Sequence, residues 1–323
     1  MRSIRRILVA IKDPGAMTLP AVAKAARIAQ ACGAHLELFH TLKASVHADT
    51  PTAYEEALGD SFETQRRQLL QRLGRIAARL RLHGIEVSTA VEYDYPAYDA
   101  IIRRAMHIDA DLIVVRQHAR KRAMTGLLRL TDWELLRYSP VPVLLVKRSG
   151  PYRHPHVLAA VDPCHSHAKP AQLDEEILAT GSQLATALRG KLHVVHAYTP
   201  VVIGAAAASV GSEVARRLDG IAAASARSGL EDLLRGSDIP QKRRYLVGEL
   251  PAAGIDTTAR RIGADIVVMG ALSRSGLQRL LIGNTAESLL DQLPCDILVV
   301  KPADFITRVP SECNGPRLVA QAH

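Results

Sequence analysis

The chain contains an internal repeat, and this feature limits its fold more than any other. Residues 111–147 align with residues 265–301 at a constant shift of 154 positions and without a gap. A second match, at a shift of 150 positions, relates residues 9–11 to residues 159–161. Two copies of one domain therefore account for nearly the whole chain. Identical aligned pairs include Asp111/Asp265, Val114/Val268, Arg120/Arg274, Leu127/Leu281, Thr131/Thr285, Leu135/Leu289, Pro140/Pro294, Leu144/Leu298 and Lys147/Lys301.

The repeat divides the chain of 323 residues into two domains and a tail. We predict an N-terminal domain over residues 1–149, a C-terminal domain over residues 150–302 and an extended tail over residues 303–323. Each domain is long enough to bury a core of its own. The tail carries two prolines and a glycine, a composition that predicts an irregular path.

Short apolar runs alternate with helical patterns in both copies. Because parallel strands joined by helices form right-handed crossovers, each copy is predicted to be a doubly wound, Rossmann-like α/β domain with a five-stranded parallel sheet. Residues 41–59 are polar and are predicted to form a loop insert. The predicted strands are 7–11, 36–40, 87–91, 111–115, 143–146, 157–161, 192–196, 245–247, 266–269 and 297–300, and the predicted helices are 19–32, 62–82, 96–106, 175–188, 212–235, 251–262 and 286–292.

A loop of small residues lies between the last two predicted strands of the second copy. An apolar run ends at Gly270, a loop with Ser273 and Gly276 follows, and a predicted helix begins just after Gly283-Asn284-Thr285. Small residues let a ligand approach the backbone, and the unpaired N–H groups at a helix N-terminus favour an anion. Ligands bind open α/β sheets at the C-terminal ends of the strands. The stretch therefore predicts an anion pocket at that edge.

These residues resemble the signature of the universal stress protein family, which reads Gly-x2-Gly-x9-Gly-(Ser/Thr). Gly270 and Gly283 hold the first and third glycine positions, Ser273 stands at the second glycine, and Asn284 stands at the hydroxyl residue. The residues 283–287 and 131–133 are similar to the tandem-domain, E-type branch of that family.

The resemblance implies a cytoplasmic, stress-related binding protein without essential catalysis. It also implies pairing of the two domains through their fifth strands, as an intramolecular pseudo-dimer, with a homodimer as a further state. Family members that bind nucleotides contact adenine through an aspartate after the first strand, and Asp162 holds that position. The expected ligand is ATP or another small anionic molecule. The predicted site residues are Asp162, Met269, Gly270, Ser273, Arg274, Gly276, Gly283, Asn284 and Thr285.

The first copy has lost this pattern of small residues. Arg116 aligns with Gly270, and Lys12 aligns with Asp162. Large side chains in this loop occupy the space that a phosphate chain needs, so we predict that the first copy binds no ligand there and serves as a partner for the second. The remaining replacements are Ala119 for Ser273, Arg122 for Gly276, Arg129 for Gly283 and Leu130 for Asn284.

Each predicted site residue also has a purely structural interpretation. Asp162 precedes Pro163 and is a common turn former, and the glycines can simply end helices and form turns. Asn284 and Thr285 can cap the predicted helix, with or without a ligand. Arg274 aligns with Arg120 of the copy predicted to be inactive, which favours surface charge for Arg274.

The histidines and cysteines do not predict a metal site. Cys164, His165 and His167 lie on one loop, while His154 and His156 lie on the other side of a predicted strand. Three ligands on a loop are weak evidence for zinc, so we expect no metal. His40 and His196, at equivalent strand ends, are expected to be packed rather than catalytic.

The remaining alternatives are an enzyme and a charge-driven binder. No Gly-x4-Gly-Lys-(Ser/Thr) motif occurs, and the glycine loop carries no carboxylate, so a weak ATPase is the most that we expect. The net charge of +9 would suit nucleic acid or a membrane surface, although a solvated arginine-rich surface also explains it. Aromatic residues make up only 4% of the chain, and no DNA-binding motif appears, so no specific nucleic acid is expected. Neither membrane insertion nor export is predicted, and four scattered cysteines fit a reducing cytoplasm.

Overall fold

The computed structural model contains two compact units. It describes residues 3–42, 52–117, 130–164, 172–200, 212–270 and 292–312. The C-terminal domain comprises Tyr152–Phe305, and the N-terminal domain comprises the residues up to Pro151 together with those from Ile306 onward. The described chain therefore ends in the domain in which it begins.

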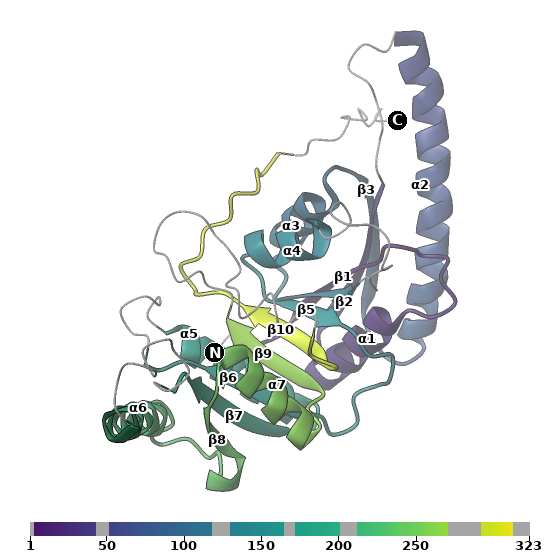
Figure 1. Ribbon diagram of the computed structural model, residues 1–323. Coiled ribbons are helices and arrows are strands. Elements are labelled where there is room, and N and C mark those ends of the chain that lie inside the picture. Colours follow the sequence, from purple (N-terminus) through teal and green to yellow (C-terminus); the bar gives the residue numbers. More distant parts are fainter. Residues whose placement is uncertain are drawn as a thin grey trace. The chain divides into compact units, whose positions relative to one another are not determined.

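The N-terminal domain is a parallel five-stranded sheet with helices on both faces. Its strand order is β3-β2-β1-β4-β5, with α1 and α2 on one face and α3 and α4 on the other (Figure 1). This is the doubly wound arrangement that the alternation of strands and helices predicts. The elements are β1 (Arg6–Ala10), α1 (Pro20–Cys32), β2 (His35–Leu42), α2 (Thr52–Arg81), β3 (Val87–Tyr93), α3 (Ala97–His107), β4 (Leu112–Arg116), α4 (Leu130–Tyr138) and β5 (Val143–Val146).

The C-terminal domain repeats this plan. Its strand order is β8-β7-β6-β9-β10, again fully parallel. Helices α5 and α6 cover one face of the sheet, and α7 covers the other. The elements are β6 (His156–Val161), α5 (Leu173–Ala187), β7 (Lys191–Tyr198), α6 (Ser212–Leu233), the 3-10 helix η3 (Gln241–Arg243), β8 (Arg244–Gly248), α7 (Pro251–Ile262), β9 (Ile266–Gly270) and β10 (Asp296–Val300).

Equivalent residues make equivalent contacts in the two domains. The carboxylate of Asp111 accepts the Arg6 N–H at 3.0 Å, and the carboxylate of Asp265 accepts the His156 N–H at 3.0 Å. In both domains a histidine of the second strand hydrogen-bonds a carbonyl at the end of the first strand. His40 Nδ1 lies 2.7 Å from the Ile11 carbonyl, and His196 Nδ1 lies 3.1 Å from the Val161 carbonyl. These recurring contacts confirm the duplication, and they give both histidines a structural role.

The central strands are continuous apolar runs because helices cover both of their faces. Val9 pairs with Leu38 on one side and with Val114 on the other. The equivalent residue Ala159 pairs with Val194 and with Val268. All these side chains are fully buried. The apolar patterns therefore predicted the strands correctly.

Helix boundaries follow local signals in some places and not in others. Proline begins α7, and Gly263, in the left-handed conformation with φ of 62°, follows its last residue. By contrast, β2 continues to Leu42 and α2 begins at Thr52, so the predicted loop over residues 41–59 is wrong for residues 41–42 and 52–59, and residues 43–51 lie outside the described residues. Residues 52–59 contain two alanines, two glutamates and a leucine, which favour a helix despite Gly59.

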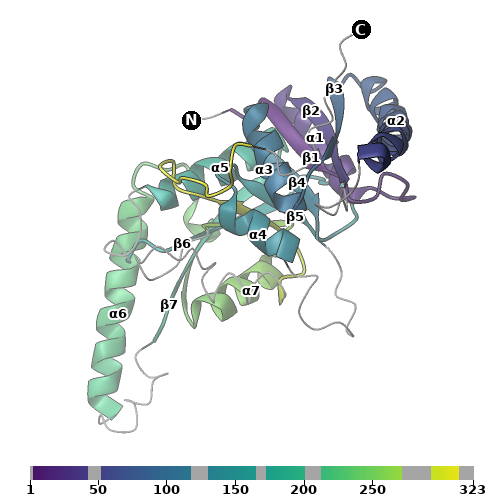
Figure 2. The ribbon, with the colours of Figure 1, turned by 90° about the horizontal axis from the view of Figure 1, so that it is seen from above.

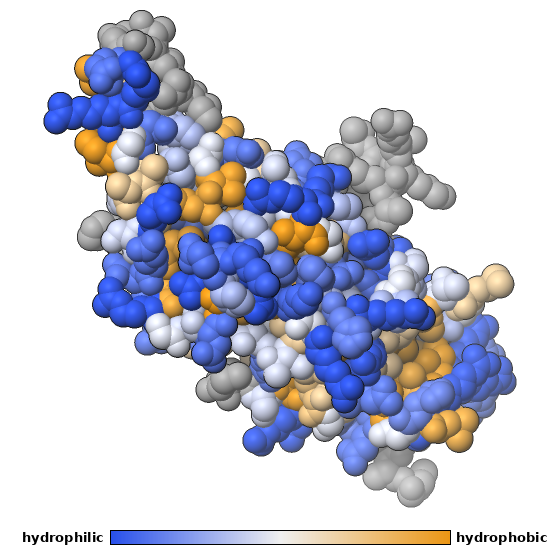
Figure 3. All heavy atoms as spheres, turned by 90° about the horizontal axis from the view of Figure 1, so that it is seen from below, coloured by the Kyte–Doolittle hydropathy of each residue, from blue (hydrophilic) through white to orange (hydrophobic). Residues whose placement is uncertain are grey.

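Polar side chains cover most of the face shown in Figure 3, with separate apolar patches between them. Two helices are much longer than the others: α2, seen lengthwise in Figure 1, and α6, seen lengthwise in Figure 2. Neither of them, nor any other helix within the described ranges, is long and apolar enough to cross a membrane.

A stack of rings lies on the α7 face of the C-terminal sheet. His156 and His193 stack with their ring centroids 5.0 Å apart, and the Tyr245 ring lies 5.9 Å beyond His193. His193 is only 6% exposed, and its Nδ1 lies 3.2 Å from the Tyr245 hydroxyl. Burial lowers the pKa of His193 to about 4, with further contributions from the positive charges of His156, Arg243 and Lys191. Its ring is therefore neutral at pH 7.

The C-terminal domain should lose stability in acid because of His193. The pKa of His193 is about 4 in the fold and about 6.5 in the unfolded chain, so its contribution is complete above pH 6.5 and falls as the pH drops toward 4. The expected loss is roughly 2 kcal/mol between pH 7 and pH 5. Hydrogen exchange of β7 peptides should show it, and His193→Phe should remove most of it. The exposed His83→Gln serves as the control, and an unchanged pH dependence in His193→Phe would refute the assignment.

Candidate functional site

The predicted site begins where two neighbouring strands end. Asp162 follows the last residue of β6, and Gly270 is the last residue of β9. Because β6 and β9 are parallel neighbours, with Ala159 opposite Val268, both ends lie at the same edge of the sheet. The structure therefore brings together Asp162, Met269 and Gly270 at the C-terminal edge, where ligands of open α/β sheets bind.

Two side chains, those of Asp174 and His196, lie next to Asp162. Its backbone N–H donates to Asp174 Oδ1 at 3.1 Å, and its own Oδ1 lies 3.9 Å from His196 Nδ1. The Asp162 side chain is 41% exposed, whereas the His196 side chain is 2% exposed. The carboxylate of Asp162 thus lies beside a buried ring and is partly exposed to solvent.

Asp174 is a member of this site that the sequence prediction missed. It lies in the first turn of α5, where a carboxylate interacts favourably with the helix dipole, and it is 6% exposed. No motif marks it, because three acidic residues occur in that turn and only the fold distinguishes the one that meets Asp162. The acidic first turn was the only signal available in the sequence.

Gly270 has a structural reason to be glycine. A Cβ atom at this position would lie 2.5 Å from Leu173 Cδ2 and 3.4 Å from Ile177 Cδ1, both on α5. Close packing of α5 on β9 therefore explains this glycine without any ligand. Met269 is 5% exposed, so its side chain belongs to the core, and only its backbone can face the edge of the sheet.

Gly270→Ala should therefore destabilise the C-terminal domain by about 1–2 kcal/mol, since the added methyl group overpacks a buried leucine. Hydrogen exchange of peptides from α5 and β9 would measure this loss. Gly74→Ala is the control, because a Cβ at Gly74 of α2 meets no atom within 4 Å. Equal stability of the two variants would show that Leu173 moves aside at no cost.

The described part of the site is acidic and holds no reactive thiol. Partial desolvation raises the pKa of the Cys164 thiol, and the nearby carboxylates of Asp162 and Asp174 raise it further. Within the described ranges, no group of three histidine, cysteine or carboxylate side chains is placed to hold a metal ion. His165 and His167 lie outside those ranges. The carboxylates suit a ligand's amine or hydroxyl groups rather than its phosphates.

The equivalent edge of the N-terminal domain has different chemistry. Lys12 is exposed at the position of Asp162, and Asp13 accepts the Gly15 N–H at 2.8 Å within a turn. Arg116, which aligns with Gly270, ends β4, and its Nη1 atom is buried. Gly270 has no side chain and so lets α5 pack closely, whereas the first copy has the long side chain of Arg116 at the equivalent position.

Six of the nine predicted site residues lie outside the described residues, and their roles stay predictions. A depression of about 210 Å³ exists elsewhere in the C-terminal domain, between α6 and β8, and Asp162 does not line it. The six residues are Ser273, Arg274, Gly276, Gly283, Asn284 and Thr285.

Comparisons with known proteins agree with the duplication. A model of the universal stress protein family matches the chain twice, at residues 3–147 and 155–301. Universal stress protein E of Salmonella typhi is 27% identical over 317 residues, which cover 96% of this chain and 98% of that protein. A universal stress protein E homologue of Haemophilus influenzae is 29% identical over 221 residues, or 68% of this chain and 71% of its own.

Solved structures share the same fold over nearly the whole chain. A Pseudomonas aeruginosa protein of unknown function is 25% identical, with a TM-score of 0.71 and 94% of both chains covered. A universal stress protein from Archaeoglobus fulgidus is 16% identical, with a TM-score of 0.61 over 93% of this chain and 99% of its own, and it supports the fold alone.

Proposed function

The chain belongs to the universal stress protein family, and from that premise we propose that it is a tandem stress-response binding protein whose C-terminal domain takes ATP or another small anionic ligand. The observation that carries this proposal is the meeting of Asp162 and Gly270 at one edge of the C-terminal sheet. The N-terminal domain places Lys12 and Arg116 at the same positions.

The two ends of the proposed site have different chemistry. Asp162, oriented by Asp174 and His196, supplies an acceptor for an amine or hydroxyl group of the ligand. A phosphate chain would have to lie away from these carboxylates, toward the loop that contains Gly276 and Gly283. This polarity favours a nucleotide over a simple phosphate anion.

We propose binding without catalysis. Phosphoryl transfer needs a metal or cations to neutralise the developing charge, and the side chains described next to Asp162 are a second carboxylate, Asp174, and a buried histidine, His196. A cytoplasmic location is part of the proposal. The pairing of the two domains within one chain, or of two chains, stays a prediction, and light scattering in solution would decide between a monomer and a dimer.

Equilibrium dialysis with radiolabelled ATP tests this function. Gly283→Arg copies the residue of the first domain and should weaken binding at least about tenfold, whereas Gly220→Ala, on α6 with no atom within 4 Å of the added carbon, should leave binding unchanged. Asp162→Asn should weaken the binding of ATP but not that of tripolyphosphate. Equal binding by the wild type and Gly283→Arg would refute the site, and steady phosphate release would refute the absence of catalysis.

A further inference from the structure

The last described residues of the chain lie against the N-terminal domain. Residues 307–310, which we call the strap, carry the contacts (yellow end of the chain in Figure 2). Val309 of the strap is only 8% exposed, whereas Ile306, just before it, is 84% exposed. The strap therefore packs against the domain through the side chain of Val309, while the neighbouring apolar side chain of Ile306 stays in solvent.

The strap completes the C-terminal end of α4. The carbonyl of Tyr138, the last residue of α4, belongs to the turn whose acceptors have no partner inside the helix. The Thr307 hydroxyl donates to this carbonyl at 2.7 Å and accepts the Val309 N–H at 3.2 Å. One hydroxyl group thus caps the helix and also fixes the turn that buries Val309.

A buried arginine of α3 holds the other end of the strap. Arg103 donates Nε to Asp94 Oδ2 at 3.0 Å and also pairs with it through Nη2, which leaves Nη1 to donate to the Pro310 carbonyl at 3.2 Å. The side chains of Arg103 and Asp94 are 9% and 1% exposed. Asp94 therefore fixes the position of the guanidinium group, and the strap accepts the hydrogen bond from its Nη1 atom.

At the position of Arg103, the C-terminal domain carries no cationic side chain. Helices α3 and α7 correspond at the shift of 154, since Ala105 and Ala259 each accept the N–H of the residue five positions later. Thr257 stands at the position of Arg103, and its hydroxyl contacts Glu249 at 3.4 Å. The copy without the glycine loop is thus the one whose α3 and α4 contact the strap.

We propose that the α3–α4 face of the N-terminal domain is a peptide-docking surface whose occupant is the segment Thr307–Pro310 of the same chain. The surface selects a hydroxyl residue for the Tyr138 carbonyl, a valine-sized side chain two positions later and a backbone carbonyl for Arg103. The tethered strap occupies the surface at high local concentration and so excludes a free segment of the same chemistry.

A fluorescent peptide of residues 304–312 tests this proposal on the full-length protein. It should bind a Thr307→Val/Val309→Asp chain at least about tenfold more tightly than the wild type, whose own strap competes. Adding Arg103→Ala should abolish that gain. A peptide carrying Val309→Asp should not bind, while one carrying Ile306→Asp should bind like the unmodified peptide, because Ile306 is exposed.

Equal affinity of the wild-type and strap-weakened chains, or no binding at millimolar peptide, would overturn the proposal. Hydrogen exchange provides a second measurement that needs no peptide. Amides of α4 and of residues 139–141 should exchange at least about tenfold faster in the Thr307→Val/Val309→Asp chain than in an Ile306→Asp chain. Equal exchange in these two variants would show that the strap does not dock.

Discussion

Gly190→Ala is expected to destabilise the C-terminal domain by more than about 3 kcal/mol. Gly190 joins α5 to β7, and a Cβ atom there would lie 2.1 Å from the Pro155 carbonyl oxygen and 3.0 Å from the Pro155 nitrogen. The obstacle is backbone, which cannot rotate aside. The same carbonyl accepts the Lys191 N–H at 2.9 Å, so relieving the clash would also break the contact that begins the β6–β7 pairing.

Hydrogen exchange of C-terminal peptides is the suitable measurement, because the chain's single tryptophan, Trp133, lies in the N-terminal domain. Gly220→Ala provides the control, since it adds the same methyl group to a helix with free space around it. That variant should be neutral or slightly stabilising, by up to about 1 kcal/mol. A loss below about 1 kcal/mol in Gly190→Ala would mean that the Pro155 backbone gives way easily.

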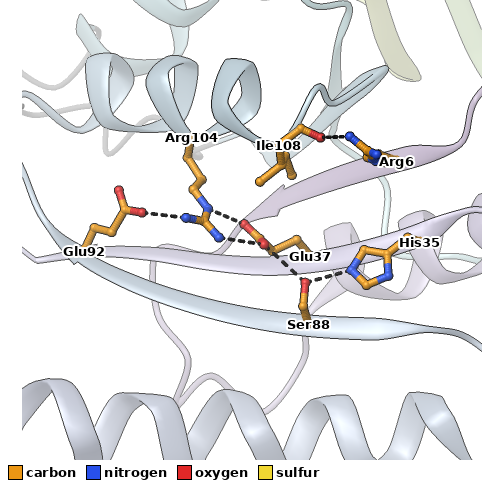
Figure 4. Close-up of polar contacts among 7 residues, drawn as sticks. All are labelled: Arg6, His35, Glu37, Ser88, Glu92, Arg104 and Ile108. Carbon is orange, nitrogen blue, oxygen red and sulfur yellow. Dashed lines mark hydrogen bonds and ion pairs between the residues drawn. The ribbon is translucent and has the colours of Figure 1, made fainter. Parts of the chain in front are cut away.

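Glu37→Ala is expected to destabilise the N-terminal domain by about 3 kcal/mol, because it leaves a largely buried arginine without its main partner. Figure 4 shows Arg104 of α3 reaching down to Glu37 of β2. Arg104 Nε and Nη2 donate to the two Glu37 oxygens at 2.6 and 2.9 Å. The side chains are 6% exposed for Glu37 and 21% exposed for Arg104, so water replaces the lost carboxylate poorly.

The rest of this network cannot compensate fully for Glu37. Glu92 accepts the Arg104 Nη1 at 3.0 Å, and Ser88 links Glu37 to His35, with Ser88 Oγ 2.8 Å from His35 Nε2. Denaturation followed by Trp133 fluorescence measures the loss. Glu86→Ala is the control, since its side chain is 88% exposed and only 3.9 Å from His35 at closest, and it should change stability by less than about 0.5 kcal/mol. A similarly small change in Glu37→Ala would contradict a structural role for the ion pair.

The architecture could be predicted from the sequence because it depends on patterns that survive duplication. Buried parallel strands are continuous apolar runs, and the repeat of Asp111 in Asp265 marks the same strand start twice. The meeting of Asp162 with Gly270 was also predictable, since neighbouring parallel strands end at one edge. These inferences need only periodicity and topology.

The remaining features depend on contacts between segments that are distant in sequence. The packing of Leu173 on Gly270, and the choice of Asp174 among three acidic residues, require the placement of α5. The ion pair of Glu37 with Arg104 has no counterpart in the second copy, where His193 and Thr258 stand at the equivalent positions. The docking of Thr307 on α4 leaves no local pattern at all.

We propose that the two copies of this duplicated domain have separate roles. The C-terminal copy carries an acidic acceptor, Asp162, at its strand edge. The N-terminal copy carries Arg116 and Lys12 at that edge, and on its α3–α4 face it holds the strap. Ligand binding and peptide docking would thus reside in different copies of one fold.

Photo-crosslinking with an azido derivative of ATP, followed by mapping of the labelled peptides, tests this division most directly. The account predicts one label per chain, found only in peptides from residues 152–305, and suppressed by unlabelled ATP and by Gly283→Arg. Labelling of both domains to a similar extent, or of the N-terminal domain alone, would contradict it.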